Sequence, residues 1–165
     1  MIAANDGSVV PPIQREACNR QLRQRIAAEA VRWIGTPYCH QGSTRQVGAD
    51  CLGLLVGVWS QVTAQHFNLM RTEQRDWASH AKGEPLLDGL NAHLLPINAD
   101  QAGAGDVIAL RWRARWPASH LAILMGDGSI IHAYEGGRVV RSNVSAWRSN
   151  IAAIFRFPNT TNLDH

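Results

Sequence analysis

The sequence predicts an α+β domain, because helical patterns come first along the chain and short strand-like segments follow them. The 165 residues fit one domain, which at this length buries a core without help from a metal or disulfide bonds. Strands that follow one another without intervening helices favour antiparallel pairing. We therefore expect helices packed on a sheet of about five antiparallel strands.

Three segments have the composition or spacing of helices. The first, residues 14–34, contains good helix formers with apolar residues at helical intervals, and it ends at Gly35-Thr36-Pro37. The second runs from Cys51 to about residue 65, and Asp50 is its expected N-cap. A shorter helix is expected over residues 86–95.

Five strands are expected after a turn at residues 100–105, where the spacing of the apolar residues changes. They cover residues 106–112, 121–125, 130–134, 139–142 and 151–157. Glycine-rich turns at residues 126–128 and 136–137 separate three of these strands. Residues 38–48 are expected to form a loop, and residues 66–84 show no clear pattern.

The expected domain covers residues 13–158, between an N-terminal arm over residues 1–12 and a C-terminal tail over residues 159–165. Gly7 and the Pro11-Pro12 pair oppose regular structure in the arm. No apolar stretch has the length of a membrane span or the character of a signal peptide. The composition is that of a soluble globular protein, with 45% hydrophobic and 18% charged residues.

Net charge and cysteine content narrow the possible partners. The formal net charge of +3 favours an anionic partner, and nucleic acid or peptidoglycan would both qualify. The arginines are scattered and no recognition motif is present, so specific nucleic-acid binding is not expected. Cys18, Cys39 and Cys51 are an odd number without CxxC spacing, which predicts at least one free thiol and no disulfide framework.

Cys51 is the first candidate for chemistry, since it lies in the first turn of the second expected helix. The positive end of the helix dipole favours a thiolate there and is expected to lower the pKa of the thiol. Free backbone N–H groups at the same place can stabilise an oxyanion. Gly53 is expected to leave room for a substrate beside the sulfur. For a cysteine considered alone, a small buried core residue is the commoner explanation.

His120 and His132 are candidates for the base that a cysteine nucleophile needs. They lie in consecutive expected strands, and the turn between these strands sets their register. A three-residue loop, Gly126-Asp127-Gly128, places both histidines on one face as diagonal neighbours, about 7–8 Å apart at the backbone. A two-residue Asp127-Gly128 turn would place them on opposite faces. We favour the three-residue loop, with Gly128 at positive φ. A nucleophile, a base and an orienting group are then all present.

Five stretches, in this order, resemble the NlpC-type cell-wall peptidases, a bacterial branch of the papain-like fold. They are Trp33-Ile34-Gly35-Thr36-Pro37-Tyr38, Asp50-Cys51-Leu52-Gly53-Leu54, Gly105-Asp106-Val107, Ser119-His120-Leu121-Ala122-Ile123 and Ile131-His132-Ala133. The resemblance implies that Cys51 is the nucleophile, His120 the base and His132 the residue that orients the base. It also implies that Tyr38 lines the catalytic centre and that the substrate is a stem peptide of bacterial peptidoglycan. No cofactor or metal is expected.

The chain departs from the commonest family pattern at Leu52, where many members have serine. Together with Gly-Thr-Pro-Tyr-x-His-Gln-Gly, this Asp-Cys-Leu-Gly-Leu variant is similar to the branch encoded among phage tail genes and phage-derived gene transfer agents. The resemblance implies a peptidase made in the bacterial cytoplasm, carried on a phage-like tail and active in the periplasm or cell wall of the target cell. Tail-tip, hub or baseplate proteins would be its partners. Separately from the resemblance, we expect residues 1–12 and the unpatterned residues 66–84 to be docking surfaces.

Further substrate-binding candidates surround these motifs. His40 and Gln41 belong to the branch motif and are expected to border the cleft, and Asp50 adjoins the nucleophile. Arg113 and Trp116 precede the His120 strand, where an arginine could bind the carboxylates of an acidic stem peptide. Each of these residues is also compatible with a structural or solvated role.

Two other functions are compatible with the same residues. Cys51, His120 and His132 could in principle bind zinc, although the H-E-x-x-H pattern and short ligand spacings are absent. The second is a catalytically idle structural tail-tip component with a papain-like fold. The presence of all three side chains argues against an idle site.

Overall fold

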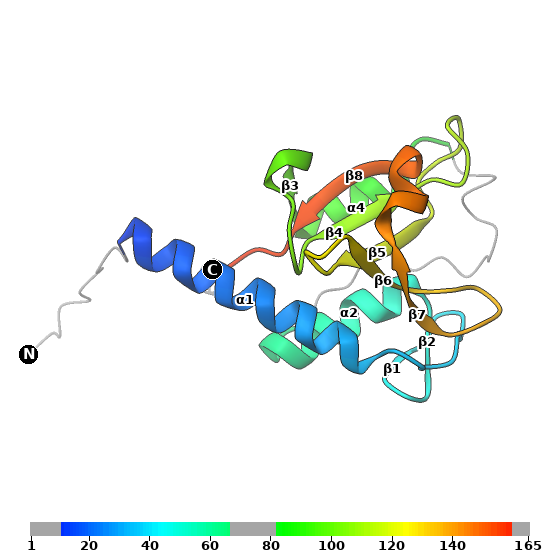
Figure 1. Ribbon diagram of the computed structural model, residues 1–165. Helices are drawn as coiled ribbons and strands as arrows, with labels where there is room; N and C mark the ends of the chain where they lie inside the picture. The colour runs from blue at the N-terminus through cyan, green and yellow to red at the C-terminus, as the bar shows by residue number, and fades with distance from the viewer. Residues whose placement is uncertain (1–10, 67–81, 160–165) are drawn as a thin grey trace, which may run out of the picture.

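The computed structural model describes residues 11–66 and 82–159. Within these residues, helices pack against one face of a six-stranded antiparallel sheet, which confirms the expected α+β class (Figure 1). All three described α-helices come before residue 94, and five of the six strands follow from residue 107 onwards. The order of helical and strand-like patterns along the sequence therefore predicted the layers correctly.

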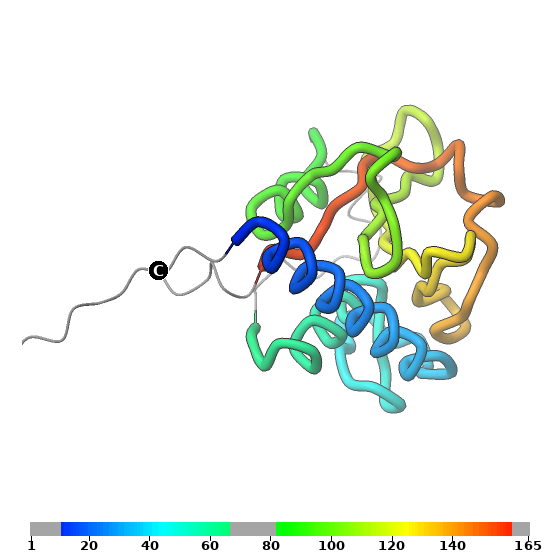
Figure 2. Tube along the Cα trace, turned by 60° about the vertical axis from the view of Figure 1, so that its left-hand side comes forward, coloured from blue at the N-terminus to red at the C-terminus, as the bar shows by residue number. Residues whose placement is uncertain are grey.

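The three α-helices of the described residues lie close to their expected positions: α1 (Pro12–Arg32), α2 (Cys51–Thr63) and α4 (Pro85–His93). The expected arm over residues 1–12 falls mostly outside the described residues. Its last residue, Pro12, is the first residue of α1, where a proline is favoured because the N–H it lacks would have no partner within the helix. α1 and α2 lie side by side beneath the sheet (Figure 2).

The sheet has the order β3-β8-β4-β5-β6-β7. Its strands are β3 (Leu95–Ile97), β4 (Val107–Leu110), β5 (His120–Leu124), β6 (Ser129–Ala133), β7 (Val139–Asn143) and β8 (Ile151–Arg156). The five expected strands are thus confirmed, with small shifts of their ends. Two 3₁₀ segments, η1 (Ala99–Gln101) and η2 (Val144–Asn150), precede β4 and β8.

Three strands were not expected. Leu95 was placed at the end of a helix, but it opens β3, a three-residue edge strand that contains a proline. The stretch expected to be a loop contains β1 (Ser43–Thr44) and β2 (Gly48–Ala49), which pair as a small separate hairpin. Strands of two or three residues are too short to show alternation between two faces, so sequence periodicity could not detect them.

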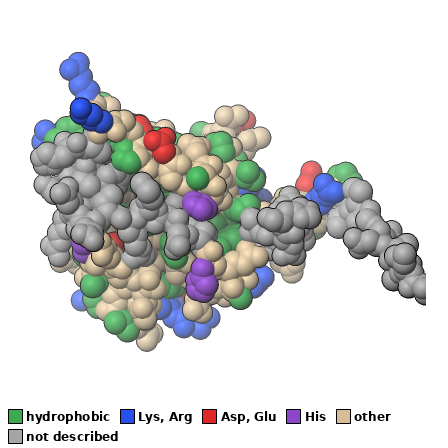
Figure 3. All heavy atoms as spheres, turned by 180° about the vertical axis from the view of Figure 1, so that it is seen from behind, with side chains coloured by type: hydrophobic (Ala, Val, Ile, Leu, Met, Phe, Trp, Pro, Cys, Tyr) green, Lys and Arg blue, Asp and Glu red, His purple; other side chains and the backbone are tan. Residues whose placement is uncertain are grey.

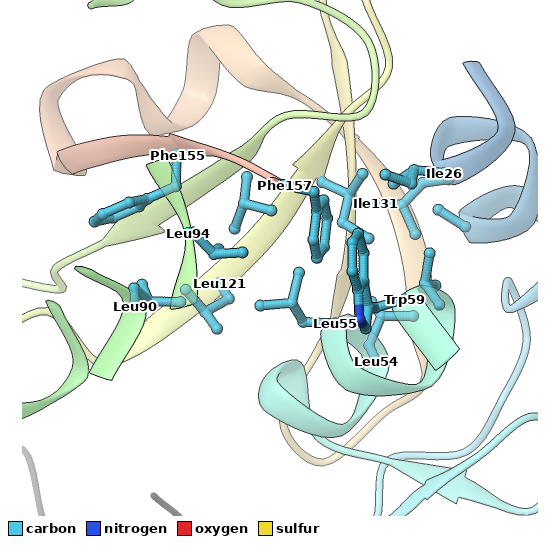
Figure 4. Close-up of a cluster of buried hydrophobic side chains, with 14 of the residues drawn as sticks. Ile26, Leu54, Leu55, Trp59, Leu90, Leu94, Leu121, Ile131, Phe155 and Phe157 are labelled. Atoms are coloured by element: carbon cyan, nitrogen blue, oxygen red, sulfur yellow. The ribbon is translucent and has the colours of Figure 1, made fainter. Parts of the chain in front are cut away.

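The core between the helices and the sheet is built around an aromatic pair. The rings of Trp59 on α2 and Phe157 after β8 stack with their centroids 4.8 Å apart (Figure 4). Leu54 and Leu55 from α2 and Ile131 from β6 lie around this pair. The opposite face of the sheet carries a smaller apolar cluster, made by Ile108, Leu110, Ala122, Ile130 and Ile154.

The hairpin between β5 and β6 has the register that brings the two histidines together. Ile123 pairs with Ile131 and Leu124 with Ile130, and the loop has three residues, with Gly126 and Gly128 at φ of 80° and 84°. The expected register and the positive φ at Gly128 are confirmed. The pairing covers only these two residue pairs, so the first residues of β5 are paired with β4 alone.

A buried carboxylate joins β8 to the turn before β4. Asp106 is fully buried, and its carboxylate accepts hydrogen bonds from the guanidinium of Arg156 at 2.8 and 2.9 Å and from the backbone N–H of Gly103 at 2.9 Å. The guanidinium of Arg23 on α1 lies 3.8 Å from the same carboxylate. The Gly105-Asp106 motif thus holds together the strands that support the candidate site.

Charged side chains do not gather in one place on the face shown in Figure 3, where Lys and Arg lie in several separate groups. Among the residues described, none of the helices has the length and apolar character needed to cross a membrane.

Candidate active site

Asp50 fixes the start of α2, where the candidate nucleophile lies. Its side chain accepts a hydrogen bond from the backbone N–H of Gly53 at 2.7 Å, which confirms the expected N-cap. The same carboxylate accepts the backbone N–H of Gln41 at 2.6 Å. Asp50 therefore joins the loop before β1 to the first turn of α2.

Gly53 does not leave room for a substrate, contrary to the expectation. The residue is buried, and a Cβ added to it would lie 1.6 Å from the carbonyl oxygen of Gly42. The space left by the missing side chain is thus occupied by the backbone of the preceding loop. Glycine is needed here for the close approach of loop and helix.

Cys51 is partly exposed, and the backbone N–H groups of Leu121, Leu52 and Cys51 itself face its sulfur. These groups favour a thiolate. Desolvation by burial opposes them, as does the negative charge of Asp50, and together these two effects raise the pKa of the Cys51 thiol to about 12. The expectation that the helix dipole lowers this pKa is wrong, because loss of hydration at the sulfur outweighs the dipole.

His120 and His132 form a buried hydrogen-bonded pair. Nε2 of His120 lies 2.9 Å from Nδ1 of His132, with the two rings close to perpendicular. Burial lowers the pKa of His120 to about 3, and the neighbouring His132 adds to this effect. Burial also lowers the pKa of His132. Both imidazoles are therefore neutral at pH 7, the state in which a histidine can accept a proton.

The pair continues to a third side chain, which the sequence interpretation did not identify. Nε2 of His132 lies 2.9 Å from the hydroxyl oxygen of Ser142 on β7. The signal was present, because Glu135-Gly136-Gly137 is a second three-residue loop, with Gly136 at φ of 75°. The register reasoning used for the first hairpin would have placed Ser142 on the face of His132.

Two tryptophans flank the histidine pair and were also missed as site residues. The ring of Trp112 stacks on His120 with centroids 5.8 Å apart, and the ring of Trp147 on η2 meets His132 edge-on at 5.4 Å. Trp147 lies 5.5 Å from Trp112, so the two indoles form a continuous wall beside the imidazoles. Sequence spacing gives no sign of this, because the loop and η2 meet only in the folded chain.

The structure brings the histidines together but does not join Cys51 to them by a hydrogen bond within the described residues. The sulfur faces the backbone N–H of Leu121, the residue after His120. Nδ1 of His120 takes part in no hydrogen bond with the described residues. Contacts between catalytic groups are often long in ligand-free proteins and tighten when a substrate binds, so this arrangement is compatible with a resting site.

Tyr38, His40 and Gln41 lie in the loop that Asp50 anchors. Tyr38 is half-buried and forms a β-bridge with Ala49, two residues before Cys51. Nδ1 of His40 lies 4.0 Å from the Asp50 carboxylate, and the Gln41 backbone is bound by it. These residues border the start of α2, and their contact with a substrate stays a prediction.

Arg113 and Trp116 are exposed and contact each other. The guanidinium carbon of Arg113 lies 4.7 Å from the centre of the Trp116 ring, which is a cation–π geometry. Their loop leads directly into β5 and His120. A role in binding acidic stem peptides stays a prediction.

The described part of the chain contains no group of three or more His, Cys, Asp or Glu side chains that could hold a metal ion. Its three cysteines are all free.

Comparison with known proteins gives consistent matches. The model of the NlpC/P60 family matches residues 35–156. The chain is 31% identical over 138 residues to gamma-DL-glutamyl hydrolase of Bacillus subtilis (strain 168), an alignment that covers 82% of this chain. The same alignment covers only 30% of that relative, so the chain corresponds to less than a third of its length.

Two solved structures illustrate the range of similar domains. The NlpC/p60 domain of the peptidoglycan hydrolase SagA has a TM-score of 0.57 and 28% identity, covering 82% of this chain and 97% of that one. RipD of Mycobacterium tuberculosis, described as a non-catalytic NlpC/p60 domain protein adapted to peptidoglycan binding, has a TM-score of 0.55 and 17% identity. That match covers 82% of this chain and 96% of RipD, and at this identity it shows a shared fold alone.

Proposed function

Because this chain belongs to the NlpC/P60 family and has its papain-like α+β fold, we propose that it is a cysteine endopeptidase that hydrolyses stem peptides of peptidoglycan. The observation that carries the proposal is the buried, neutral His120–His132 pair, in which Nε2 of His120 lies 2.9 Å from Nδ1 of His132. The residue after His120, Leu121, directs its backbone N–H towards the Cys51 sulfur. Nucleophilic catalysis by cysteine needs these three groups together: the thiol, a base and a group that orients the base.

The first half of the proposed reaction forms a thioester. Cys51 begins as a thiol, because its pKa is raised to about 12. As the sulfur attacks the carbonyl carbon of the scissile bond, its proton passes to Nδ1 of His120. The backbone N–H groups of Cys51 and Leu52 at the start of α2 stabilise the oxyanion. His120 then protonates the leaving amine as the carbon–nitrogen bond breaks.

The second half restores the enzyme. His120 is again neutral and removes a proton from a water molecule, which attacks the thioester carbonyl. The carbon–sulfur bond breaks, the peptide leaves as a carboxylic acid and the proton returns to the Cys51 sulfur. His132 holds the His120 ring in place through both halves.

The scissile bond is proposed to adjoin a D-glutamyl residue of the stem peptide. The similarity to a protein named gamma-DL-glutamyl hydrolase supports this choice. Arg113 at the site's edge offers a positive charge for the free carboxylate of such a residue, and its stacking on Trp116 holds the guanidinium in a limited range of positions.

An idle, peptidoglycan-binding domain is the second candidate function. Two observations favour it: within the described residues no hydrogen bond joins the Cys51 thiol to His120, and the raised pKa keeps this thiol protonated. RipD, described as non-catalytic, shows that the fold occurs without activity.

Digestion of purified peptidoglycan separates these functions. Wild type should release fragments whose masses identify the bond cut, and Cys51→Ala should release none. Cys18→Ala is the matched control, because Cys18 is exposed on α1, far from α2 in the sequence. Equal digestion by wild type and Cys51→Ala would refute the peptidase. Binding to peptidoglycan without cleavage by wild type would establish the idle domain.

We further propose that the chain acts from a phage-like tail tip or baseplate, opening the cell wall for DNA delivery. The support is the Asp-Cys-Leu-Gly-Leu variant together with Gly-Thr-Pro-Tyr-x-His-Gln-Gly. The proposed docking segments, residues 1–12 and 66–84, lie mostly outside the described residues. Mass spectrometry of purified tail particles should detect the chain, and its absence from them would refute tail carriage.

A further inference from the structure

Three neighbouring strands carry a chain of polar side chains on one face of the sheet. His132 on β6 pairs directly with Val140, and Ile130 pairs with Ser142, so Ser142 is a diagonal neighbour of His132. The register of β5 and β6 places His120 diagonally from His132 in the same way. The two diagonal contacts have the same length, 2.9 Å, and link His120, His132 and Ser142 in series.

The two hydrogen bonds must have the same order of donor and acceptor along the chain from His120 to Ser142. A neutral imidazole has one N–H donor and one nitrogen acceptor, so the proton on His132 decides the role of both its neighbours. If Nε2 of His132 carries the proton, it donates to Ser142, and Nδ1 accepts from Nε2–H of His120. If Nδ1 carries it, both bonds reverse, and His120 is protonated on Nδ1.

We propose that Ser142 is a positioning residue that accepts a hydrogen bond from Nε2–H of His132 and thereby holds both histidines as Nε2–H tautomers. In this arrangement the lone pair on Nδ1 of His120 is free to take the proton of Cys51. In the reverse arrangement that nitrogen already carries a proton and cannot act as a base. The role of His120 as a base rests on the proposed peptidase function, whereas the tautomers of the two histidines are independent of that function.

The contacts of His120 favour this direction. Its Nδ1 has no acceptor among the described residues. The reverse arrangement would place an N–H donor at this nitrogen with no protein acceptor, whereas the forward arrangement leaves a lone pair there and keeps both bonds of the chain. Ser142 is only partly buried and lies on the edge strand β7, so its own hydroxyl proton can reach water.

Long-range ¹H–¹⁵N correlation spectra of histidine-labelled protein test the inference without a substrate. At pH 7, wild type should show His120 and His132 protonated on Nε2, with assignments from His120→Gln and His132→Gln. Ser142→Ala should raise the share of the Nδ1–H form in both rings. Ser142→Thr keeps the hydroxyl and should restore the wild-type spectrum. An Nδ1–H tautomer of His120 in wild type, or an unchanged spectrum in Ser142→Ala, would overturn the proposal.

Kinetics on peptidoglycan fragments test the catalytic consequence. Ser142→Ala should lower kcat about five- to tenfold with KM unchanged, the effect of losing one neutral hydrogen bond. Ser149→Ala, an exposed serine on η2, is the matched control and should keep the wild-type kcat. A fall in kcat with unchanged tautomers would mean a structural role and overturn the proposal. An inactive wild type with the expected tautomers would instead refute the peptidase function and leave the hydrogen-bond chain established.

Discussion

At the scale of single residues, the protonation states of Cys51 and His120 are set by burial more than by position in secondary structure. A cysteine at a helix start is exposed to the dipole, but the dipole acts on a sulfur that has lost its hydration and lies close to the Asp50 carboxylate. The resting pair is therefore a neutral thiol and a neutral imidazole. In the proposed reaction, proton transfer then has to accompany attack on the substrate rather than precede it.

The neutral state of His120 has a measurable effect on stability. Its pKa is lowered to about 3 in the folded protein, and the ordinary value in an unfolded chain is about 6.5. Between these values the unfolded state binds more protons than the folded state. The contribution of His120 to the free energy of unfolding is therefore fully present above pH 6.5, and it is lost as the pH decreases towards 3. At pH 5 this histidine alone should account for a loss of about 2 kcal/mol.

Urea unfolding at pH 7 and pH 5 checks this value. His120→Gln cannot titrate, so it should lose about 2 kcal/mol less than wild type over this interval. His93→Gln, which removes an exposed histidine on α4, is the control for the loss of one histidine. Parallel pH profiles for wild type and His120→Gln would show that His120 is not held neutral by the fold.

Some properties of the site residues could be predicted from the sequence, and others depend on the whole fold. The face shared by His120 and His132 was predictable, because Gly128 signals a three-residue loop and the loop sets the register. The pKa of Cys51 was not predictable, because desolvation comes from residues brought together by the whole fold. Gly53 was misinterpreted for the same reason, since the atom closest to it belongs to Gly42 in a preceding loop.

At the scale of elements, the loop before α2 and the helix start behave as one unit held by Asp50. Its two carboxylate oxygens bind one backbone N–H on each side, that of Gln41 in the loop and that of Gly53 in the helix. The absence of a side chain at Gly53 lets the two segments touch. Asp50 therefore has two effects on Cys51: it fixes the helix start, and its charge disfavours the thiolate.

Asp50→Asn separates these two effects. The single amide oxygen can still accept the Gly53 N–H and cap α2, the Gln41 N–H loses its acceptor, and the negative charge that raises the Cys51 pKa is removed. We expect alkylation of Cys51 by iodoacetamide at pH 7 to be at least about threefold faster in Asp50→Asn than in wild type, because more of the thiol is ionised. Mass spectrometry after timed reactions gives the rate at each cysteine.

Cys18 and Cys39 are exposed in the same molecule and serve as internal references. Their rates should not differ between the two proteins. Asp50→Ala is the matched control for the cap, since it loses both the charge and the acceptor. A slower or unchanged rate at Cys51 in Asp50→Asn would show that the charge of Asp50 does not oppose ionisation of this thiol.

Element boundaries show why some of the fold was predictable and some was not. α2 was predicted closely because Asp50 is a strong N-cap signal and the helix body is apolar. β3 was missed because its three residues lie at the edge of the sheet, where they pair with β8. The wall of Trp112 and Trp147 was missed because it joins a loop to η2, and no sequence rule relates those two segments.

At the scale of the whole molecule, the two faces of the sheet have different tasks. Leu121 and Ile131 face the helices and complete the main core, whereas His120 and His132 share the other face with Ala122 and Ile130. Cys51 lies on the helix side, next to Leu121, in the part of β5 that is not paired with β6. The site therefore depends on the sheet keeping its position relative to α2, which makes the contacts at the edges of the strands important for function.

The Asp106 cluster is a buried polar contact that holds this arrangement. Its carboxylate is fully buried, and the guanidinium of Arg156 on β8 binds both oxygens. Asp106→Ala should lower the free energy of unfolding by about 3–5 kcal/mol, since it leaves Arg156 and the Gly103 N–H without their buried acceptor. Asp127→Ala removes an aspartate whose pair with Arg141 is exposed, and it should cost far less. Urea unfolding followed by circular dichroism measures both losses. Equal losses in the two variants would show that the buried cluster does not hold β8 and the start of β4 together, and that apolar packing alone supports the sheet beneath the site.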